Sequence, residues 1–283
     1  MEHTVSYCLS QGLAKVRNED LIGFFDNIFW LLDGASIPSD ISVHPKFDTL
    51  WYVKHLSLAL TEIVCADSSR PLSDLLSDAI ASLVERYFTG DGAAELRGYY
   101  PPSSTVVLTR ITAQKFDYLV LGDSYLLTDA NGSVESISDL RLRHVATDLR
   151  EQCARLLRAR ELESLAEVER RLARRELAAR NSPEGYWIAG LESAAAEHAI
   201  TGTCMLSQDR SRLLALSDGL AAAYEHLSLY SSWKELLDAV ETEGFQALIN
   251  RIRHEEAADS FGKTHSRPRI SDDASGLLIQ IAP

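Results

Sequence analysis

The chain has 283 residues, of which 46% are hydrophobic and 24% charged, a balance typical of a soluble globular protein. Its formal net charge of −13 argues against general nucleic-acid binding, which requires a basic surface. The four cysteines form no Cys-x-x-Cys pair, which argues against a zinc knuckle or a dithiol redox site and favours reduced thiols.

The N-terminal sequence Met-Glu-His-Thr lacks the basic start and apolar core of a signal peptide. The apolar runs, such as Ile28 to Leu32, are far too short to span a bilayer. We therefore expect a cytoplasmic protein with no membrane partner.

Short apolar segments rich in β-branched and aromatic residues predict buried strands. In chain order these segments are roughly 4–9, 21–25, 28–32, 105–111, 118–121, 213–216 and 277–281. Another segment, 125–128, is followed by Asn131-Gly132, which predicts a hairpin turn and antiparallel pairing.

Two helices are expected between the early and middle strands, and the second has a clear apolar face between Leu72 and Phe88. Near the C-terminus, residues 233–240 and 245–252 predict another helical pair. This order of strands and helices predicts an α+β fold in which helices cover a sandwich of two sheets.

The segment from about 141 to 185 differs from the rest because it is dense in arginine and glutamate. It contains eleven arginines between Arg141 and Arg180, with leucines at helical spacing. This pattern predicts one or two amphipathic helices with ion-paired outer faces, ending at the turn-forming sequence Asn181–Gly185. The segment is either a solvated helical insert packed on the domain or a lid beside the functional site.

Acidic residues follow three predicted strands directly and precede the last one. They are Asp33, Asp123, Asp218 and the pair Asp272-Asp273. Carboxylates at strand ends lie at the rim of a sheet, where they can converge, and the glycines beside the first three let the backbone turn sharply. Because Mg²⁺ and Mn²⁺ prefer oxygen ligands, the pattern predicts a divalent-cation site.

Six short motifs occur in a fixed order: Asn18-Glu19-Asp20, Leu31-Leu32-Asp33-Gly34, Ser104-Thr105-Val106-Val107, Leu121-Gly122-Asp123-Ser124, Ser217-Asp218-Gly219 and Asp272-Asp273-Ala274-Ser275. This order resembles the motif set of the bacterial type 2C metal-dependent serine/threonine protein phosphatases, over residues 4 to 282 apart from the Arg/Glu-rich segment. The resemblance implies a single phosphatase domain, 1–283, with a helical insert at about 141–185. It also implies an α-β-β-α sandwich of two mainly antiparallel sheets with two Mn²⁺ or Mg²⁺ ions at one end.

The same resemblance implies a metal-binding role for each motif acid. Asp33 would bridge both ions, and the Gly34 carbonyl would bind one of them. Asp218 and Asp272 would complete the second ion's ligands. Asp123, together with Asp218, corresponds to a position where some members of the family bind a third ion.

Glu19 and Asp20 would hold metal-bound waters in this scheme, with Glu19 and Asp33 as the catalytic acids. A water between the two cations would be acidified and would attack phosphorus in line with the leaving alkoxide. The cations would also offset charge on the phosphoryl oxygens, so that no covalent intermediate is needed.

Several positions depart from the family pattern. Lys15 stands where the family has a phosphate-binding arginine, and it lacks the bidentate fork of a guanidinium. Arg17 lies close by, so Lys15 and Arg17 are both candidates for binding phosphate. Ala35 follows the Asp33-Gly34 pair where a histidine acid often occurs, and Asp273 replaces the usual asparagine.

These departures leave three functions open. The first is hydrolysis of phosphoserine and phosphothreonine in proteins. The second is hydrolysis of a small phosphorylated metabolite, favoured if the Arg/Glu-rich segment closes over a compact pocket. The third is a weakly active or non-catalytic binding module on the same fold.

Overall fold

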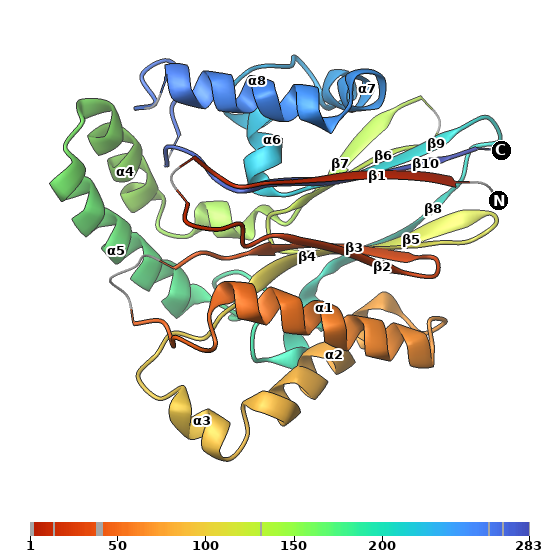
Figure 1. The fold of residues 1–283 in the computed structure, drawn as a ribbon, viewed down its shortest axis with the longest axis horizontal. Coiled ribbons are helices and arrows are strands. Elements are labelled where there is room, and N and C mark those ends of the chain that lie inside the picture. The colour runs from red at the N-terminus through yellow and green to blue at the C-terminus, as the bar shows by residue number, and fades with distance from the viewer. Residues whose placement is uncertain are drawn as a thin grey trace.

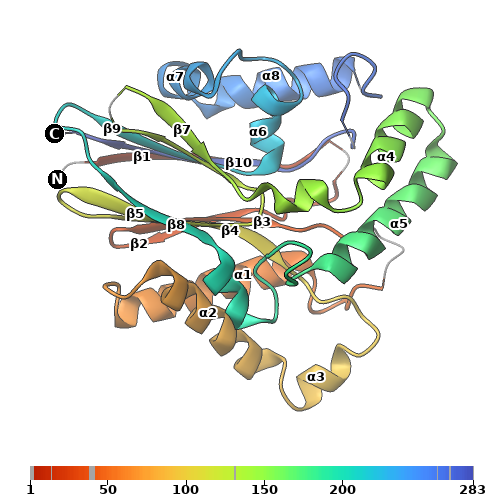
Figure 2. The same ribbon diagram turned by 180° about the vertical axis from the view of Figure 1, so that it is seen from behind.

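Two five-stranded antiparallel sheets are stacked face to face, and helices cover the outer face of each (Figure 1 and Figure 2). In this computed structural model, the described residues are 3–13, 15–37, 42–130, 132–259, 261–267 and 269–282. From edge to edge, the first sheet consists of β1 (His3–Ser10), β10 (Ala274–Ile281), β9 (Ser211–Leu216), β6 (Tyr125–Asp129) and β7 (Val134–Ile137). The second consists of β2 (Leu21–Phe25), β3 (Ile28–Gly34), β4 (Ser104–Ile111), β5 (Lys115–Leu121) and β8 (Ile200–Met205). The predicted α-β-β-α sandwich is confirmed.

The central strands are continuous apolar runs because both faces of each sheet are buried. Along β3, Ile28, Trp30 and Leu32 pack on the helix side, whereas Phe29 and Leu31 pack between the two sheets. All five side chains are at most 2% exposed. Since successive strand residues point to opposite faces, burial on both sides removes the usual alternation of polar and apolar residues.

Helices α1 (Thr49–Ala66) and α2 (Leu72–Tyr87) cover the second sheet, whereas α6 (Asp218–Glu225), α7 (Trp233–Glu243) and α8 (Phe245–Ala258) cover the first (Figure 1). Two shorter helices are α3 (Asp91–Glu95) and η2 (Ser193–His198). The Asp48 side chain accepts a hydrogen bond from Trp51 N at 2.8 Å, which satisfies a free N–H at the start of α1. Across the described residues, no helix combines the length and apolar composition needed to cross a membrane.

The Arg/Glu-rich segment forms a pair of helices that extends beyond one end of the sheets (Figure 1). The turn η1 (Leu140–His144) leads into α4 (Thr147–Ala159), which packs against α5 (Leu162–Ala179). The two helices share a small apolar core that includes Leu149, Cys153, Leu157 and Val168. The amphipathic helices predicted for this segment are therefore present.

Several elements were not predicted from the sequence, among them α3, η2, β8 and α6. Strand β8 lies at a sheet edge and is mostly exposed, so its Thr-Gly-Thr sequence carries no apolar run. Helix α6 has only eight residues and begins at Asp218, directly after a strand. The predicted β6–β7 hairpin is antiparallel as expected, although Asn131 of its turn lies outside the described residues.

A buried arginine ties the first sheet to α7. Arg212 in β9 is 2% exposed and donates to Asp129 of β6 at 2.5 and 3.1 Å. It also donates to Asp238 and Glu241 of α7, both at 2.7 Å. Removing one partner of such a group leaves uncompensated buried charge.

We therefore expect Arg212→Ala to lower the free energy of unfolding by about 3–5 kcal/mol, because Asp129 would remain buried without its partner. Arg210 is the matched control, since it pairs with the same Glu241 but is 53% exposed. Arg210→Ala should cost less than about 1 kcal/mol. Urea unfolding of both variants measures the difference, and equal effects would contradict a structural role for Arg212.

Candidate metal centre

The acids that follow the predicted strands meet at one end of the sandwich. Asp33 ends β3, Asp123 follows β5, Asp218 begins α6 directly after β9, and Asp272 precedes β10. The backbone N–H of Asp218 lies 3.4 Å from Asp33 Oδ2, so the two sheets approach each other closely at this point.

Two glycines allow this approach. Gly122 has a φ of +86°, a conformation that side-chain-bearing residues rarely adopt, and it turns the chain between β5 and Asp123. At Gly219, an added Cβ would lie 1.9 Å from the Asp273 carbonyl oxygen. The glycine next to Asp218 is therefore required for the close contact between α6 and the segment before β10.

A cavity of about 440 Å³ lies over this end of the sheets. Five of the predicted site residues line it: Asp33, Gly34, Asp123, Asp218 and Asp272. The other four, Lys15, Arg17, Glu19 and Asp20, are not in its lining. Asp20 is a buried carboxyl group that accepts a hydrogen bond from Ser275 Oγ at 2.6 Å.

Burial and mutual repulsion raise the pKa values of three of these carboxyl groups. Burial raises the pKa of Asp33 well above its ordinary value, and Asp20 and Asp218 raise it further. Burial, together with Asp272, raises the pKa of Asp218 to about 7. Burial also raises the pKa of Asp20 to about 7, although the bond from Ser275 opposes the shift.

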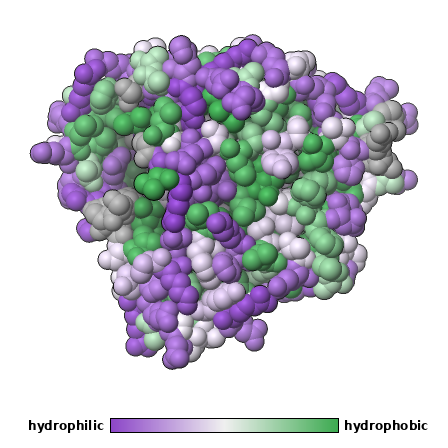
Figure 3. Space-filling view, viewed as in Figure 1, coloured by the Kyte–Doolittle hydropathy of each residue, from purple (hydrophilic) through white to green (hydrophobic). Residues whose placement is uncertain are grey.

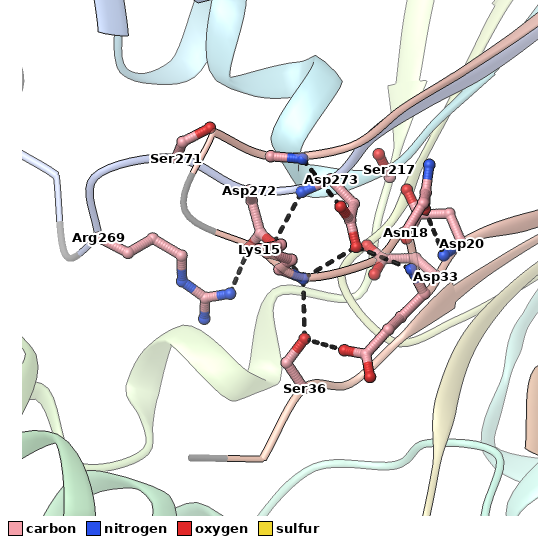
Figure 4. A network of polar contacts seen from close by, with 12 residues as sticks. Lys15, Asn18, Asp20, Asp33, Ser36, Ser217, Arg269, Ser271, Asp272 and Asp273 are labelled. Carbon is pink, nitrogen blue, oxygen red and sulfur yellow. Dashed lines mark hydrogen bonds and ion pairs between the residues drawn. The ribbon is translucent and has the colours of Figure 1, made fainter. Parts of the chain in front are cut away.

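Asp272 differs from its neighbours because two cations pair with it. Lys15 Nζ lies 2.6 Å from Asp272 Oδ1, and Arg269 Nη1 donates to Asp272 Oδ2 (Figure 4). Burial opposes ionisation of Asp272, but Arg269 and Lys15 outweigh it and lower the pKa of this carboxyl group. Within this acidic cluster, side-chain cations therefore lower the pKa of Asp272, whereas burial raises the pKa values of Asp20, Asp33, Asp123 and Asp218.

Lys15 is held by the segment that contains Asp272 and Asp273 and by Ser36. Its ammonium group donates to Ser36 Oγ at 2.8 Å and to Asp273 Oδ2 at 3.1 Å. Glu19 is in turn fixed by Ser36, which donates to Glu19 Oε2 at 2.5 Å. The Arg17 guanidinium pairs with Asp48 at 2.7 Å and lies 4.0 Å from Glu19 Oε1.

The oxygen donors fit a hard divalent cation, although they are not closed into a ligand cage. Among the described residues, no three Asp, Glu, His or Cys side chains are arranged to hold a metal ion as they stand. Nevertheless, several repelling carboxylates share one cavity, and Asp20 Oδ1 is buried with no hydrogen-bond partner in the described part of the chain. Unpaired carboxylate oxygens of this kind suit Mn²⁺ or Mg²⁺.

The sequence did not identify the residues that roof the cavity. Side chains from η1, α4 and α5 line one wall of the cavity. Within that wall, Arg150 of α4 pairs with Glu176 of α5. Arg269 was also missed, because a single arginine three residues before Asp272 carries no motif signal.

Comparisons with known proteins identify relatives in structure but not in sequence. No family model matches the sequence, and no curated protein matches it either. Stp1, a serine/threonine phosphatase from Staphylococcus aureus, superposes with a TM-score of 0.57 and 16% identity, covering 100% of this chain and 96% of that one. The catalytic domain of the serine/threonine protein phosphatase PstP, solved with two manganese ions, gives a TM-score of 0.53 and 14% identity over 99% of each chain.

The PPM Ser-Thr phosphatase MsPP from Mycobacterium smegmatis, solved with cacodylate, superposes with a TM-score of 0.51 and 17% identity. The match covers 98% of this chain and 97% of that one. The chain has the fold of the bacterial serine/threonine phosphatases. At these identities the likeness extends to the fold alone, and the roles of individual residues rest on the geometry above.

The raised pKa values determine how the metal-free protein responds to pH. The folded state holds protons on Asp33, Asp20 and Asp218 that the unfolded chain releases above about pH 4. The contribution of these groups to the free energy of unfolding therefore falls as the pH rises from about 4 to about 7.

We expect metal-free Asp33→Asn to melt at or above the temperature of the wild type at pH 8, because the amide removes one repelling charge. The advantage should shrink at pH 5, where the wild-type carboxyl is protonated. Melting curves in chelator at both pH values test this, with the exposed Asp78→Asn as the control. A lower melting temperature for Asp33→Asn at pH 8 would mean that Asp33 is an ordinary structural aspartate.

Proposed function

We propose that this chain is a metal-dependent phosphatase that hydrolyses phosphoserine and phosphothreonine in proteins. The observation that carries the proposal is the convergence of Asp33, Asp123, Asp218 and Asp272 from separate strand ends on one cavity. The fold, which the chain shares with a phosphatase solved with two manganese ions, supports the same function.

The residues that would hold two Mn²⁺ or Mg²⁺ ions are Asp33, the Gly34 carbonyl, Asp218 and Asp272, with Asp123 and Asp218 available to a third. When bound, the ions would acidify a water and offset charge on the phosphoryl oxygens. Asp33 and Asp218 could contribute to one site because the Asp218 backbone N–H lies 3.4 Å from Asp33 Oδ2.

Glu19 and Asp20 are proposed to orient water at the site. The backbone N–H of Glu19 donates to Asp273 Oδ2 at 2.8 Å, which fixes the Asn-Glu-Asp motif against the segment before β10. The unpaired Oδ1 of Asp20 leaves an acceptor for such a water. Phosphate binding by Lys15 and Arg17 stays a prediction, as do the single-domain organisation with its insert and the cytoplasmic location.

Asp33→Asn should reduce metal-dependent hydrolysis of p-nitrophenyl phosphate by at least about 100-fold, because it removes a ligand common to both ions. Asp218→Asn and Asp272→Asn should have comparable effects, and Asp78→Asn should have none. The assay compares Mn²⁺, Mg²⁺ and chelator. Activity of Asp33→Asn near that of the wild type, or wild-type turnover that does not depend on metal, would reject the assignment. Absent wild-type turnover would favour a binding module.

One observation favours a second candidate, a phosphatase of small phosphorylated metabolites. The insert contributes Arg143, Arg150, Glu176 and Arg180 to the cavity wall, so α4 and α5 cover part of the site. Its volume of about 440 Å³ is within the range of small-molecule pockets.

A substrate panel separates the two functions. If the substrate is a protein, contacts outside the cavity add to transition-state binding, and phosphopeptides should show kcat/KM values at least about tenfold above those of compact phosphoesters. The panel should include phosphoserine and phosphothreonine peptides and a set of sugar and carboxylic-acid phosphates. The reverse order would establish the small-molecule function.

A further inference from the structure

We propose that Arg269 is the guanidinium that binds the phosphoryl oxygens of the substrate, and that it reaches them by exchanging its ion pair with Asp272 for a metal ion. This inference rests on the proposed phosphatase function. It assigns the anion-binding role to a residue outside the six motifs.

Lys15 has no donor left for a phosphate. An ammonium group has three N–H bonds, and three acceptors surround this one: Ser36 Oγ at 2.8 Å, Asp272 Oδ1 at 2.6 Å and Asp273 Oδ2 at 3.1 Å. Lys15 therefore holds Asp272 and Asp273 in place, and binding a substrate oxygen would require it to release one of them.

Arg17 is already paired with two acids, since its Nη2 also lies 4.0 Å from Glu19 Oε1. Its Nη2 lies 2.7 Å from Asp48 Oδ2, at the start of α1, and its side chain is 46% exposed. It is not among the residues that line the cavity.

Arg269 lies in the cavity wall and has donors to spare. Its Nη1 donates to Asp272, whereas its Nε and Nη2 have no hydrogen-bond partner among the described residues. The side chain is 53% exposed although it borders the acidic floor. A guanidinium with a free edge can hold two oxygens of a phosphoryl group at once.

The two oxygens of Asp272 are used differently. Oδ1 accepts from Lys15 Nζ and, at 2.9 Å, from the backbone N–H of Asp273. The partner of Oδ2 in the described part of the chain is Arg269 (Figure 4). A cation that binds Asp272 through Oδ2 would compete with Arg269 for that oxygen, and a displaced guanidinium would remain in the wall of the same cavity.

The charges around Arg269 support this exchange. Asp272, Asp218, Asp33 and, from the roof, Glu176 all raise the pKa of Arg269, so it stays protonated in this cavity. With Asp33, Asp218 and Asp272 engaged by divalent cations, the site would lose its excess negative charge and could accept an anionic substrate.

The exchange predicts opposite effects on metal and phosphate for Arg269→Ala. The dissociation constant for Mn²⁺, measured by calorimetry, should fall about three- to tenfold because the competing cation is gone. The inhibition constant for inorganic phosphate and the KM for p-nitrophenyl phosphate should both rise about tenfold or more, the factor that one charge-assisted hydrogen bond contributes. The change in kcat should be smaller than the change in KM.

Two further variants make the result specific. Arg269→Lys keeps the competing charge but not the fork, so its Mn²⁺ affinity should stay near that of the wild type while phosphate binding is only partly restored. Arg86→Ala removes an arginine that pairs with Glu62 at 2.8 Å on the remote α1–α2 face, and it should change neither constant.

The outcomes separate the two proposals. If the wild type binds Mn²⁺ and hydrolyses phosphoester but Arg269→Ala leaves phosphate inhibition and KM unchanged, the role of Arg269 is rejected and the phosphatase function stands. Weaker Mn²⁺ binding in Arg269→Ala would also reject it, since that indicates a structural contribution. A wild type that neither binds Mn²⁺ nor hydrolyses phosphoester rejects both.

Discussion

The rest of this site depends on one interaction, the mutual repulsion of carboxylates that lie at the same end of the two sheets. The strand ladders hold Asp33 and Asp218 together, because β3 and β9 each end at the same rim and the Asp218 backbone approaches Asp33. The backbone positions of both residues are therefore fixed, Asp33 by β3 and Asp218 by the start of α6 after β9. The repulsion is relieved when a carboxylate binds a proton or a cation, and the raised pKa values of Asp33 and Asp218 reflect this.

Asp273 organises the opposite side of the cluster. It is 2% exposed and accepts hydrogen bonds from the backbone N–H groups of Gly12 and Glu19 and from Lys15 Nζ. Two departures from the phosphatase motifs, Lys15 and Asp273, are therefore one ion pair in space, 3.1 Å apart. Lys15 keeps the positive charge of the arginine that it replaces, and the added negative charge of Asp273 lies against it, which connects the segment after β1 to the segment before β10.

The helical insert brings positive charge to an acidic region. Helices α4 and α5 bury only a small apolar core of their own, so their polar faces remain available to the cavity. Arg150 spans the two helices through its pair with Glu176, and Arg143 pairs with Glu225 of α6 at 3.0 Å. The first pair holds α4 and α5 together, and the second attaches the insert to the sandwich at the edge of the cavity.

Much of the fold could be predicted from the sequence. A strand that is buried on both faces is a continuous apolar run, such as Ile28 to Leu32, and such a run can be recognised without knowing its partners in the fold. The same is true of the strand-end acids, since a carboxylate directly after a buried strand must lie at the rim. Strand β8 was not predicted because an exposed edge strand needs no apolar run. Helix α6 was not predicted because eight residues are too few to show the helical spacing of apolar residues.

The cations of the site were decided by the tertiary structure alone. The family resemblance offered Lys15 first and the neighbouring Arg17 as a substitute, whereas in the structure Lys15 is enclosed by Asp272 and Asp273 and Arg17 pairs with Asp48. Arg269 borders the cavity although no motif includes it. Motifs constrain residues through local geometry, whereas the partner of a long, flexible cationic side chain depends on which acids the fold brings near it from distant parts of the chain.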